Sequence, residues 1–102
     1  MSKYAPHVYS EHVQIATLEH WVLLLNGQER VRIELDDGSM LSGTVAVRPT
    51  IQTYLDDNDN EGVNGQLRLD QLDASQEPHW IWMDRIVAVH PLPLGDDPQV
   101  MP

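Results

Sequence analysis

The sequence predicts a mainly β domain, in which one N-terminal helix precedes a strongly bent, five-stranded antiparallel barrel. Apolar residues first recur every three or four positions, as in a helix, and after Gly27 they alternate with polar residues, as in strands. Gly43 interrupts the second alternating segment, and a glycine there lets a short sheet bend over on itself. The length of 102 residues suits one domain with a single core.

The helix is expected over residues 10–25. Ser10 can cap its first turn, and the negative charge of Glu11 suits the positive end of a helix. One stripe of apolar side chains should be buried: Ile15, Leu18, Val22 and Leu25. Gly27 can adopt the left-handed conformation that ends a helix. Residues 1–9 show no clear periodicity and are expected to form an irregular arm.

Five strands are expected, at about residues 29–35, 40–55, 64–72, 79–83 and 86–90. In the first strand, Val31, Ile33 and Leu35 alternate with charged residues and should face the core. Gly38 follows in a hairpin turn, where a glycine takes a positive φ angle at little cost.

The second strand contains the expected bend. Four of its residues should share the inward face: Leu41, Gly43, Val45 and Val47. Pro49 interrupts the alternation, so the pattern leaves open whether residues 49–55 continue the strand or break away. Residues 56–62 should form an exposed acidic loop. The tail, residues 91–102, is rich in proline and is expected to be extended or disordered.

The charge balance limits the kinds of partner. Six Lys and Arg face sixteen Asp and Glu, which gives a formal net charge of -10. This charge works against nonspecific binding of RNA, DNA or an acidic membrane, because such binding depends on cations. The N-terminus lacks the pattern of a signal peptide, and the longest apolar run, residues 21–25, is too short to cross a bilayer. A cytoplasmic location is therefore expected.

Patterns for catalysis or cofactor binding are weak. The absence of cysteine excludes disulfides and thiolate chemistry. The acidic loop matches the start of a calcium-binding loop, but Arg68 stands where the final glutamate ligand is required. The histidines lack the spacing of a zinc site: His7, His12, His20, His79 and His90. Adjacent aspartates in polar turns lack the contrasting environments of an acid–base pair. We expect a non-enzymatic protein without a metal or other cofactor.

Arginines on the strands form one candidate surface, for nucleic acid. Arg30 and Arg32 lie two apart on the outward face of the first strand, and Arg48 and Arg68 belong to the second and third strand regions. Together they could form a positive stripe. The alternative, which we favour, is that cross-strand pairs with Glu34 and Asp70 neutralise it.

The strand near residue 80 forms a second candidate surface, for protein. If Ile81 and Met83 face inward, Trp80 and Trp82 lie on the opposite side and are exposed in a monomer. Exposed tryptophans are enriched in interfaces. The alternative is that the N-terminal arm, the helix or the tail over residues 91–102 covers them. The last strand adds two residues to this candidate interface: Val87 and Val89. The expected partner is a second copy of the chain or another protein, with a dimer favoured over a ring because like-charged subunits repel one another.

Residues 31–45 resemble the first half of the Sm1 motif of Sm-like proteins, the class that includes LSm and Hfq proteins. They read Val31-x-Ile33-x-Leu35-Asp36-Asp37-Gly38-x-x-Leu41-x-Gly43-x-Val45. Residues 81–89 are similar in outline to the second motif of the family. The resemblance covers about residues 10–90 and points to short, acidic bacterial variants of the fold. It implies an Sm-like barrel whose last two strands pair with neighbouring subunits.

The sequence departs from the family at the positions that bind RNA. RNA-binding Sm proteins place an aspartate and an asparagine after the second strand, and a gapless count from Gly43 finds Pro49 and Thr53 there. The basic residue and glycine of the second motif would fall near Asp84 and Arg85. Proline cannot donate a backbone hydrogen bond, and Asp84 would repel phosphate. We therefore expect a binding or interaction module, with RNA binding through the arginine face as the alternative.

Overall fold

A computed structural model of the chain describes residues 3–73 and 75–92. One helix and six strands follow one another in the order α1 (His12–Leu24), β1 (Arg30–Leu35), β2 (Met40–Val45), β3 (Ile51–Leu55), β4 (Glu61–Gln71), β5 (His79–Trp82) and β6 (Ile86–Pro91). A 3-10 turn, η1 (Met83–Arg85), joins the last two strands. All of the strand pairs are antiparallel.

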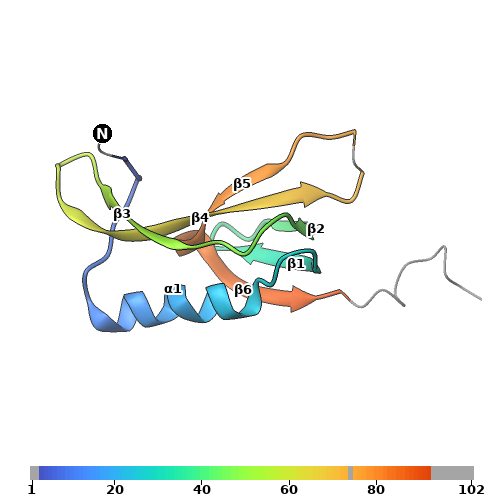
Figure 1. Cartoon of the computed structure of the whole chain (residues 1–102), viewed down its shortest axis with the longest axis horizontal. Coiled ribbons are helices and arrows are strands. Elements are labelled where there is room, and N and C mark those ends of the chain that lie inside the picture. Colours follow the sequence, from blue (N-terminus) through green and yellow to red (C-terminus); the bar gives the residue numbers. More distant parts are fainter. Residues whose placement is uncertain (1–2, 74, 93–102) are drawn as a thin grey trace, which may run out of the picture.

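The strand pairing requires a strongly curled sheet (Figure 1). β5 pairs with β4 and β6 pairs with β1, so these two strands stand at opposite ends of the path β5-β4-β2-β1-β6. Only the three residues of η1 connect them. Three residues are too few to connect the two ends of a flat sheet of this width, so the sheet curls into a half-barrel. Its buried residues include Val31, Ile33 and Leu35, as the alternation predicted.

Gly43 is the point of closest approach between β2 and β4. A Cβ atom at this position would lie well inside van der Waals distance of the Asp70 carbonyl oxygen and 2.8 Å from Cγ of Leu69. Only glycine fits here, which confirms the close backbone approach predicted from its place in the strand. Gly38 has a φ angle of 87°, as predicted for the turn.

The region expected to form one strand over residues 40–55 is divided. β2 and β3 both pair with β4, but the register changes between Val45, opposite Leu69, and Ile51, opposite Gly65. Five residues, 46–50, therefore face three residues of β4, and the extra two form a bulge. This bulge breaks the alternation, so Val47 is 66% exposed and the prediction that it faces inward was wrong.

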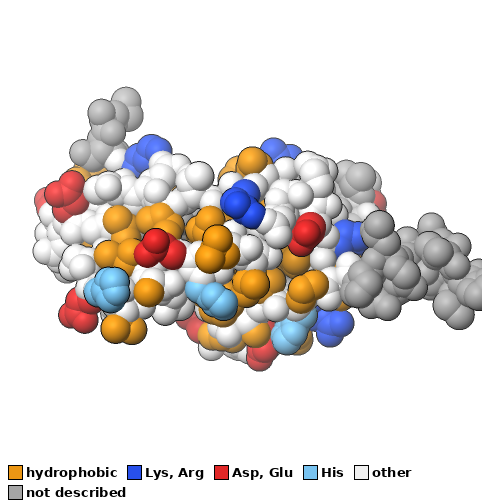
Figure 2. Space-filling model, turned by 60° about the horizontal axis from the view of Figure 1, so that its bottom comes forward, with side chains coloured by type: hydrophobic (Ala, Val, Ile, Leu, Met, Phe, Trp, Pro, Cys, Tyr) orange, Lys and Arg blue, Asp and Glu red, His pale blue; other side chains and the backbone are white. Residues whose placement is uncertain are grey.

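The helix packs one side against the sheet. Leu18 and Leu25 are buried, Val22 is half-buried against the same core, and Ile15 is half-buried, which agrees with the predicted stripe. The opposite side of α1 also has exposed apolar side chains, and Figure 2 brings this side of the molecule forward.

Both ends of the helix differ from the prediction. The residue at the N-cap is Glu11 rather than Ser10, and it makes no side-chain hydrogen bond to the first turn. At the other end, Gln28 rather than Gly27 has the positive φ angle, 72°. The Gln28 amide donates to the Val45 carbonyl at 2.7 Å, so pairing with the end of β2 holds this conformation.

The N-terminal arm, described from residue 3 onward, contains no helix or regular strand, but it is paired with the sheet at two points. It forms a parallel bridge between Tyr4 and Leu55 and an antiparallel bridge between Tyr9 and Val63. The amides of Tyr9 and Val63 each donate to the carbonyl of the other, at 2.9 and 2.7 Å. The arm thus covers the hairpin of β3 and β4. Of the predicted tail, residues 93–102 lie outside the described residues, whereas Pro91 belongs to β6.

Candidate interaction surface

β5 presents its two tryptophans away from the core. Ile81 and Met83 are buried, so Trp80 and Trp82 project on the other face of the strand. Trp80 is 59% exposed and lies opposite Arg68 of β4. The guanidinium carbon of Arg68 lies 5.9 Å from the centroid of the Trp80 ring, within the range of a cation–π contact.

Trp82 is less exposed than predicted. It is half-buried because the edge of its ring packs against Tyr54 of β3, with the ring centroids 5.3 Å apart. Burial raises the pKa of the Tyr54 hydroxyl. Trp82 thus packs against a neighbouring side chain on the outer face of the sheet, and Trp80 is the more accessible of the two tryptophans.

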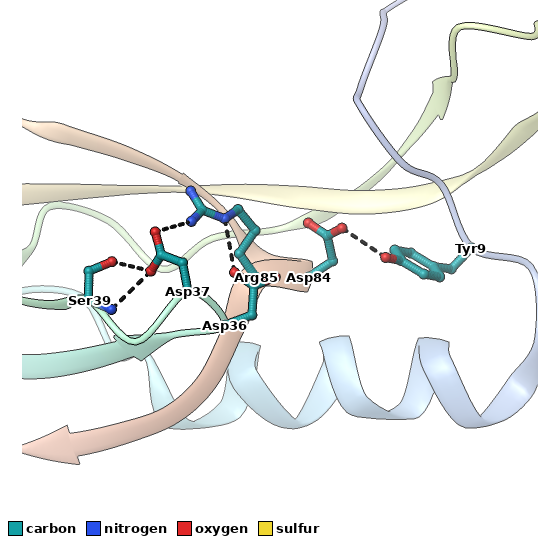
Figure 3. Close-up of polar contacts among 6 residues, drawn as sticks. All are labelled: Tyr9, Asp36, Asp37, Ser39, Asp84 and Arg85. Carbon is teal, nitrogen blue, oxygen red and sulfur yellow. Dashed lines mark hydrogen bonds and ion pairs between the residues drawn. The ribbon is translucent and has the colours of Figure 1, made fainter.

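Side chains of the turn η1 bind both the N-terminal arm and the β1–β2 turn (Figure 3). The hydroxyl of Tyr9 donates to Oδ2 of Asp84 at 2.8 Å, which ties the N-terminal arm to the turn. Arg85 donates from Nε to Asp36 at 3.3 Å and from Nη2 to Asp37 at 3.0 Å, which ties the β1–β2 turn to the same point. Asp84 and Arg85 stand near the place where RNA-binding Sm proteins have a basic residue and a glycine. Here they form a junction between the N-terminal arm and the β1–β2 turn.

These contacts shift two pKa values. Burial, and then the hydrogen bond and negative charge of Asp84, raise the pKa of Tyr9 to about 12. Hydrogen bonds from the hydroxyl and amide of Ser39, followed by the positive charge of Arg85, lower the pKa of Asp37. Tyr9 is therefore neutral and Asp37 ionised across the neutral pH range.

A cavity of about 330 Å³ opens beside this junction. Its wall combines aromatic rings, two carboxylates and one guanidinium: Pro6, His7, Tyr9, Asp36, Trp82, Asp84 and Arg85. The arm, β5 and η1 all contribute to it. Neither His7 nor Tyr9 could be predicted to belong to a site, because Tyr9 and Asp84 are 75 positions apart and no motif links them.

The four predicted interface residues do not form one patch. Trp80 and Trp82 lie on β5, whereas Val87 and Val89 lie on β6, at the other end of the strand order. Val89 pairs with Ile33 and packs against the core, while Val87 falls at a register shift and is 50% exposed. Of these four residues, Trp82 lines the cavity described above, and Trp80 is its neighbour on the same face of β5.

The predicted arginine stripe is divided between two places. Arg30, Arg32 and Arg68 lie on the outer face of the sheet, on β1 and β4, with β2 between them. Arg48 lies in the bulge instead, where its guanidinium donates to the side chain of Asn26.

Asp70, one of the two carboxylates expected to neutralise these arginines, does pair with an arginine, but within one strand. Asp70 pairs with Arg68 along the same strand, at 2.9 Å, because the two side chains are neighbours on one face of β4. Glu34 lies 3.9 Å from His90 of β6.

The acidic loop is organised by its own side chains. Oδ1 of Asp56 accepts from the amides of Asn58 and Asn60, both at 2.9 Å. These hydrogen bonds lower the pKa of Asp56. Within residues 3–73 and 75–92, the structure has no group of three His, Asp or Glu side chains that could hold a metal ion. No helix in this part of the chain is long and apolar enough to cross a membrane.

The fold defines the class of protein. The chain is similar to a Xanthomonas campestris protein, XC5848, whose crystal structure is described as adopting a novel variant of the Sm-like motif. The two are 81% identical and superpose with a TM-score of 0.87, and the match covers 91% of this chain and 100% of the other. The fold is therefore Sm-like, as the resemblance in residues 31–45 predicted.

The family follows from the sequence. The model of a family described as a domain of unknown function, DUF3247, matches residues 2–92, and the chain belongs to this family. No curated protein matches the chain.

Proposed function

We propose that this Sm-like domain is a non-enzymatic module that binds a protein partner through its β5 surface, which we define as Trp80, Trp82, Tyr9, Asp84 and Arg85. The observation that carries the proposal is the 59% exposure of Trp80 on a strand that ends the path of the sheet. Tryptophan is among the residues most enriched at the energetic centres of interfaces.

The partner that we propose is an extended protein segment. Among the described residues, β5 pairs with β4 alone, so its other edge presents backbone groups to an incoming strand. Addition of a strand to a sheet edge provides affinity through backbone hydrogen bonds, and neighbouring pockets provide specificity. Trp80 would cover such a segment from the outer face.

The adjacent cavity favours a cationic side chain on that segment. The rings of Tyr9 and Trp82 stand beside the carboxylates of Asp36 and Asp84, with one guanidinium, Arg85, among them. Aromatic faces and carboxylates together bind lysine or arginine. The net charge of -10 also attracts a cationic partner from a distance.

The titration of the described carboxylates supports a non-enzymatic role. The shifts that are resolved for Asp37, Asp56 and Asp73 all lower the pKa, with hydrogen bonds from neighbouring groups as the main cause. A general acid at neutral pH needs the opposite shift.

The proposal is tested by affinity capture from an extract of the native cells, with and without nuclease. We expect the full chain to capture a protein that survives nuclease treatment and is released by salt. Trp80→Ala should reduce the affinity about 10-fold or more. Val47→Ala is the matched control, because Val47 is comparably exposed but lies in the bulge, and it should bind as the parent does.

Two outcomes would overturn the proposal. If nuclease abolishes the capture, the ligand is a nucleic acid and the arginines of the outer face become the candidate site. If Trp80→Ala captures the same protein with the same affinity as the parent, the β5 surface is not the interface. Circular dichroism of the variant checks that its fold is unchanged.

A further inference from the structure

The outward side of α1 has a second apolar stripe. The inward stripe follows spacings of three, four and three residues: Ile15, Leu18, Val22 and Leu25. The same spacings occur two positions earlier, at three apolar residues and one histidine: Val13, Ala16, His20 and Leu23. Because each residue of a helix turns by about 100°, a shift of two places the second stripe on the opposite side. All four of its residues are exposed, Val13 at 74% and Leu23 at 67%.

The spacing of this outward stripe is that of a helix–helix seam. Alternating steps of three and four residues keep side chains along one line that a second helix can pack against. A surface helix that only covers a core has polar residues on its outer side, so this stripe indicates a further contact. Figure 2 shows hydrophobic side chains on this side of the molecule.

The charge of α1 indicates what the contact is made with. Residues 12–24 contain one carboxylate, Glu19, and neither lysine nor arginine, on a chain with a net charge of -10. Two copies of so acidic a chain repel each other, and they can approach at least cost where carboxylates are scarcest. A cationic partner would find little to pair with on this face. The apolar, weakly charged stripe therefore fits a second copy of the chain.

We propose that two copies of the chain form an antiparallel dimer through the outward stripe of α1. A two-fold axis midway along the stripe sets Val13 against Leu23 of the second copy, and Ala16 against its His20. The small side chain of Ala16 leaves room for the imidazole ring, so large and small residues alternate along the seam. This dimer is independent of the β5 surface, which α1 does not contribute to.

A groove beside Leu23 extends the contact. Its walls come from the helix, the bulge and the start of β3, and include Glu19, Val22, Arg48, Pro49 and Ile51. In the antiparallel arrangement, Val13 of the second copy lies next to Leu23 and can enter this groove. The seam itself is short, since 13 residues of helix span about 20 Å, so we expect a dimer that dissociates on dilution.

Sedimentation velocity of the full chain, from micromolar to millimolar concentration, tests the proposal. The parent should pass from monomer to dimer, and Leu23→Glu should raise the dissociation constant about 10-fold or more by placing a carboxylate against Val13 of the second copy. Val87→Glu is the control, because it makes a comparable substitution at an exposed valine on β6 and should dimerise as the parent does. Trp80→Ala should also dimerise normally.

Cysteine cross-linking tests the antiparallel arrangement directly, since the natural chain has no cysteine. The double variant Val13→Cys/Leu23→Cys should form a covalent dimer under mild oxidation, while Val13→Cys alone should not. A parallel pairing would cross-link the single variant instead.

Three results would overturn the proposal: a parent that stays monomeric at all concentrations, a dimer that Leu23→Glu leaves unchanged, or a chain ending at Leu92 that dimerises when the full chain does not. The last result would mean that residues 93–102 occupy the stripe.

Discussion

The two ends of strand β4 are stabilised in different ways. In its second half, the side chains of Leu67 and Leu69 are completely buried in the core, and the neighbouring strands are β2 and β5. In its first half, the completely buried side chain is polar, Asn64, and the partners are β3 and the N-terminal arm. One end is held by apolar packing inside the half-barrel, and the other by backbone pairing and one buried amide. A mutation should therefore have different consequences at each end.

The largest effect is expected at the barrel end, for Gly43→Ala. The added methyl group would meet the backbone of Asp70 and the side chain of Leu69, so β2 and β4 would have to separate. We expect the free energy of unfolding to fall by about 3 kcal/mol, because the obstructing atoms include backbone that cannot rotate away. Urea denaturation measures this change.

Gly27→Ala is the matched control for that experiment. A Cβ atom at Gly27 would lie 3.5 Å from its nearest neighbour, the Arg48 amide nitrogen, which is ordinary contact. Its stability should stay within about 1 kcal/mol of the parent. Equal losses for the two variants would show that the close approach at Gly43 does not govern the stability of the barrel end.

The barrel end could be predicted from the sequence, because each pattern that predicts it lies within a single helix, strand or turn. The alternation of Val31, Ile33 and Leu35 with polar residues predicts that their side chains face the core. Gly43 predicts the bend from its position within a single strand. The helix stripe was visible for the same reason. Pro49 indicated an interruption in this region but did not predict the division into β2 and β3, because the bulge depends on how β4 pairs on both sides of it.

The arm end and the cavity could not be predicted, because their contacts join distant segments. Tyr9 reaches Asp84 across 75 positions, and the side chain of Asn64 reaches the carbonyl of His7 across 57. Neither pair has a spacing or composition that a single sequence reveals. The exposure of Trp80 followed from alternation within β5, whereas the partial burial of Trp82 depended on Tyr54 of another strand.

A smaller effect is expected at the arm end, for Asn64→Ala. The Nδ2 group of Asn64 donates to the His7 carbonyl at 2.9 Å, and its Oδ1 atom accepts from the Gly65 amide at 2.8 Å. Loss of both removes a partner from the buried Gly65 amide and from the part-buried His7 carbonyl, which costs about 1–3 kcal/mol. Because the loss falls on the arm, hydrogen exchange in residues 3–9 should accelerate more than exchange in β1.

Asn58→Ala is the control for the arm. Asn58 is exposed, and its hydrogen bond to Asp56 is made by the backbone amide, which alanine retains. Its stability should stay within about 0.5 kcal/mol of the parent. If Asn64→Ala accelerated exchange equally in the arm and in β1, the two ends of β4 would unfold as one unit and the contrast between them would fail.

The smallest effect at neutral pH is expected for Tyr9→Phe, which removes the hydrogen bond to Asp84 and costs about 1 kcal/mol. Its distinguishing feature is the dependence on pH. The pKa of Tyr9 rises from 10.0 to about 12 on folding, so the contribution is fully present below pH 10. Between pH 10 and about 12 the unfolded chain loses this proton first, and the stability of the parent should fall as the pH rises.

Comparison with a second tyrosine separates this contribution from general alkaline destabilisation. Tyr9→Phe should lose stability less steeply than the parent above pH 10. Tyr54→Phe should keep the part of the slope that is due to Tyr9 and lose only the part due to Tyr54, whose pKa is raised by burial without a carboxylate. Denaturation curves from pH 8 to 11.5 measure both slopes. A Tyr9→Phe variant as steep as the parent would mean that the bond to Asp84 does not hold the arm in solution, and that the cavity beside it is open on the arm side.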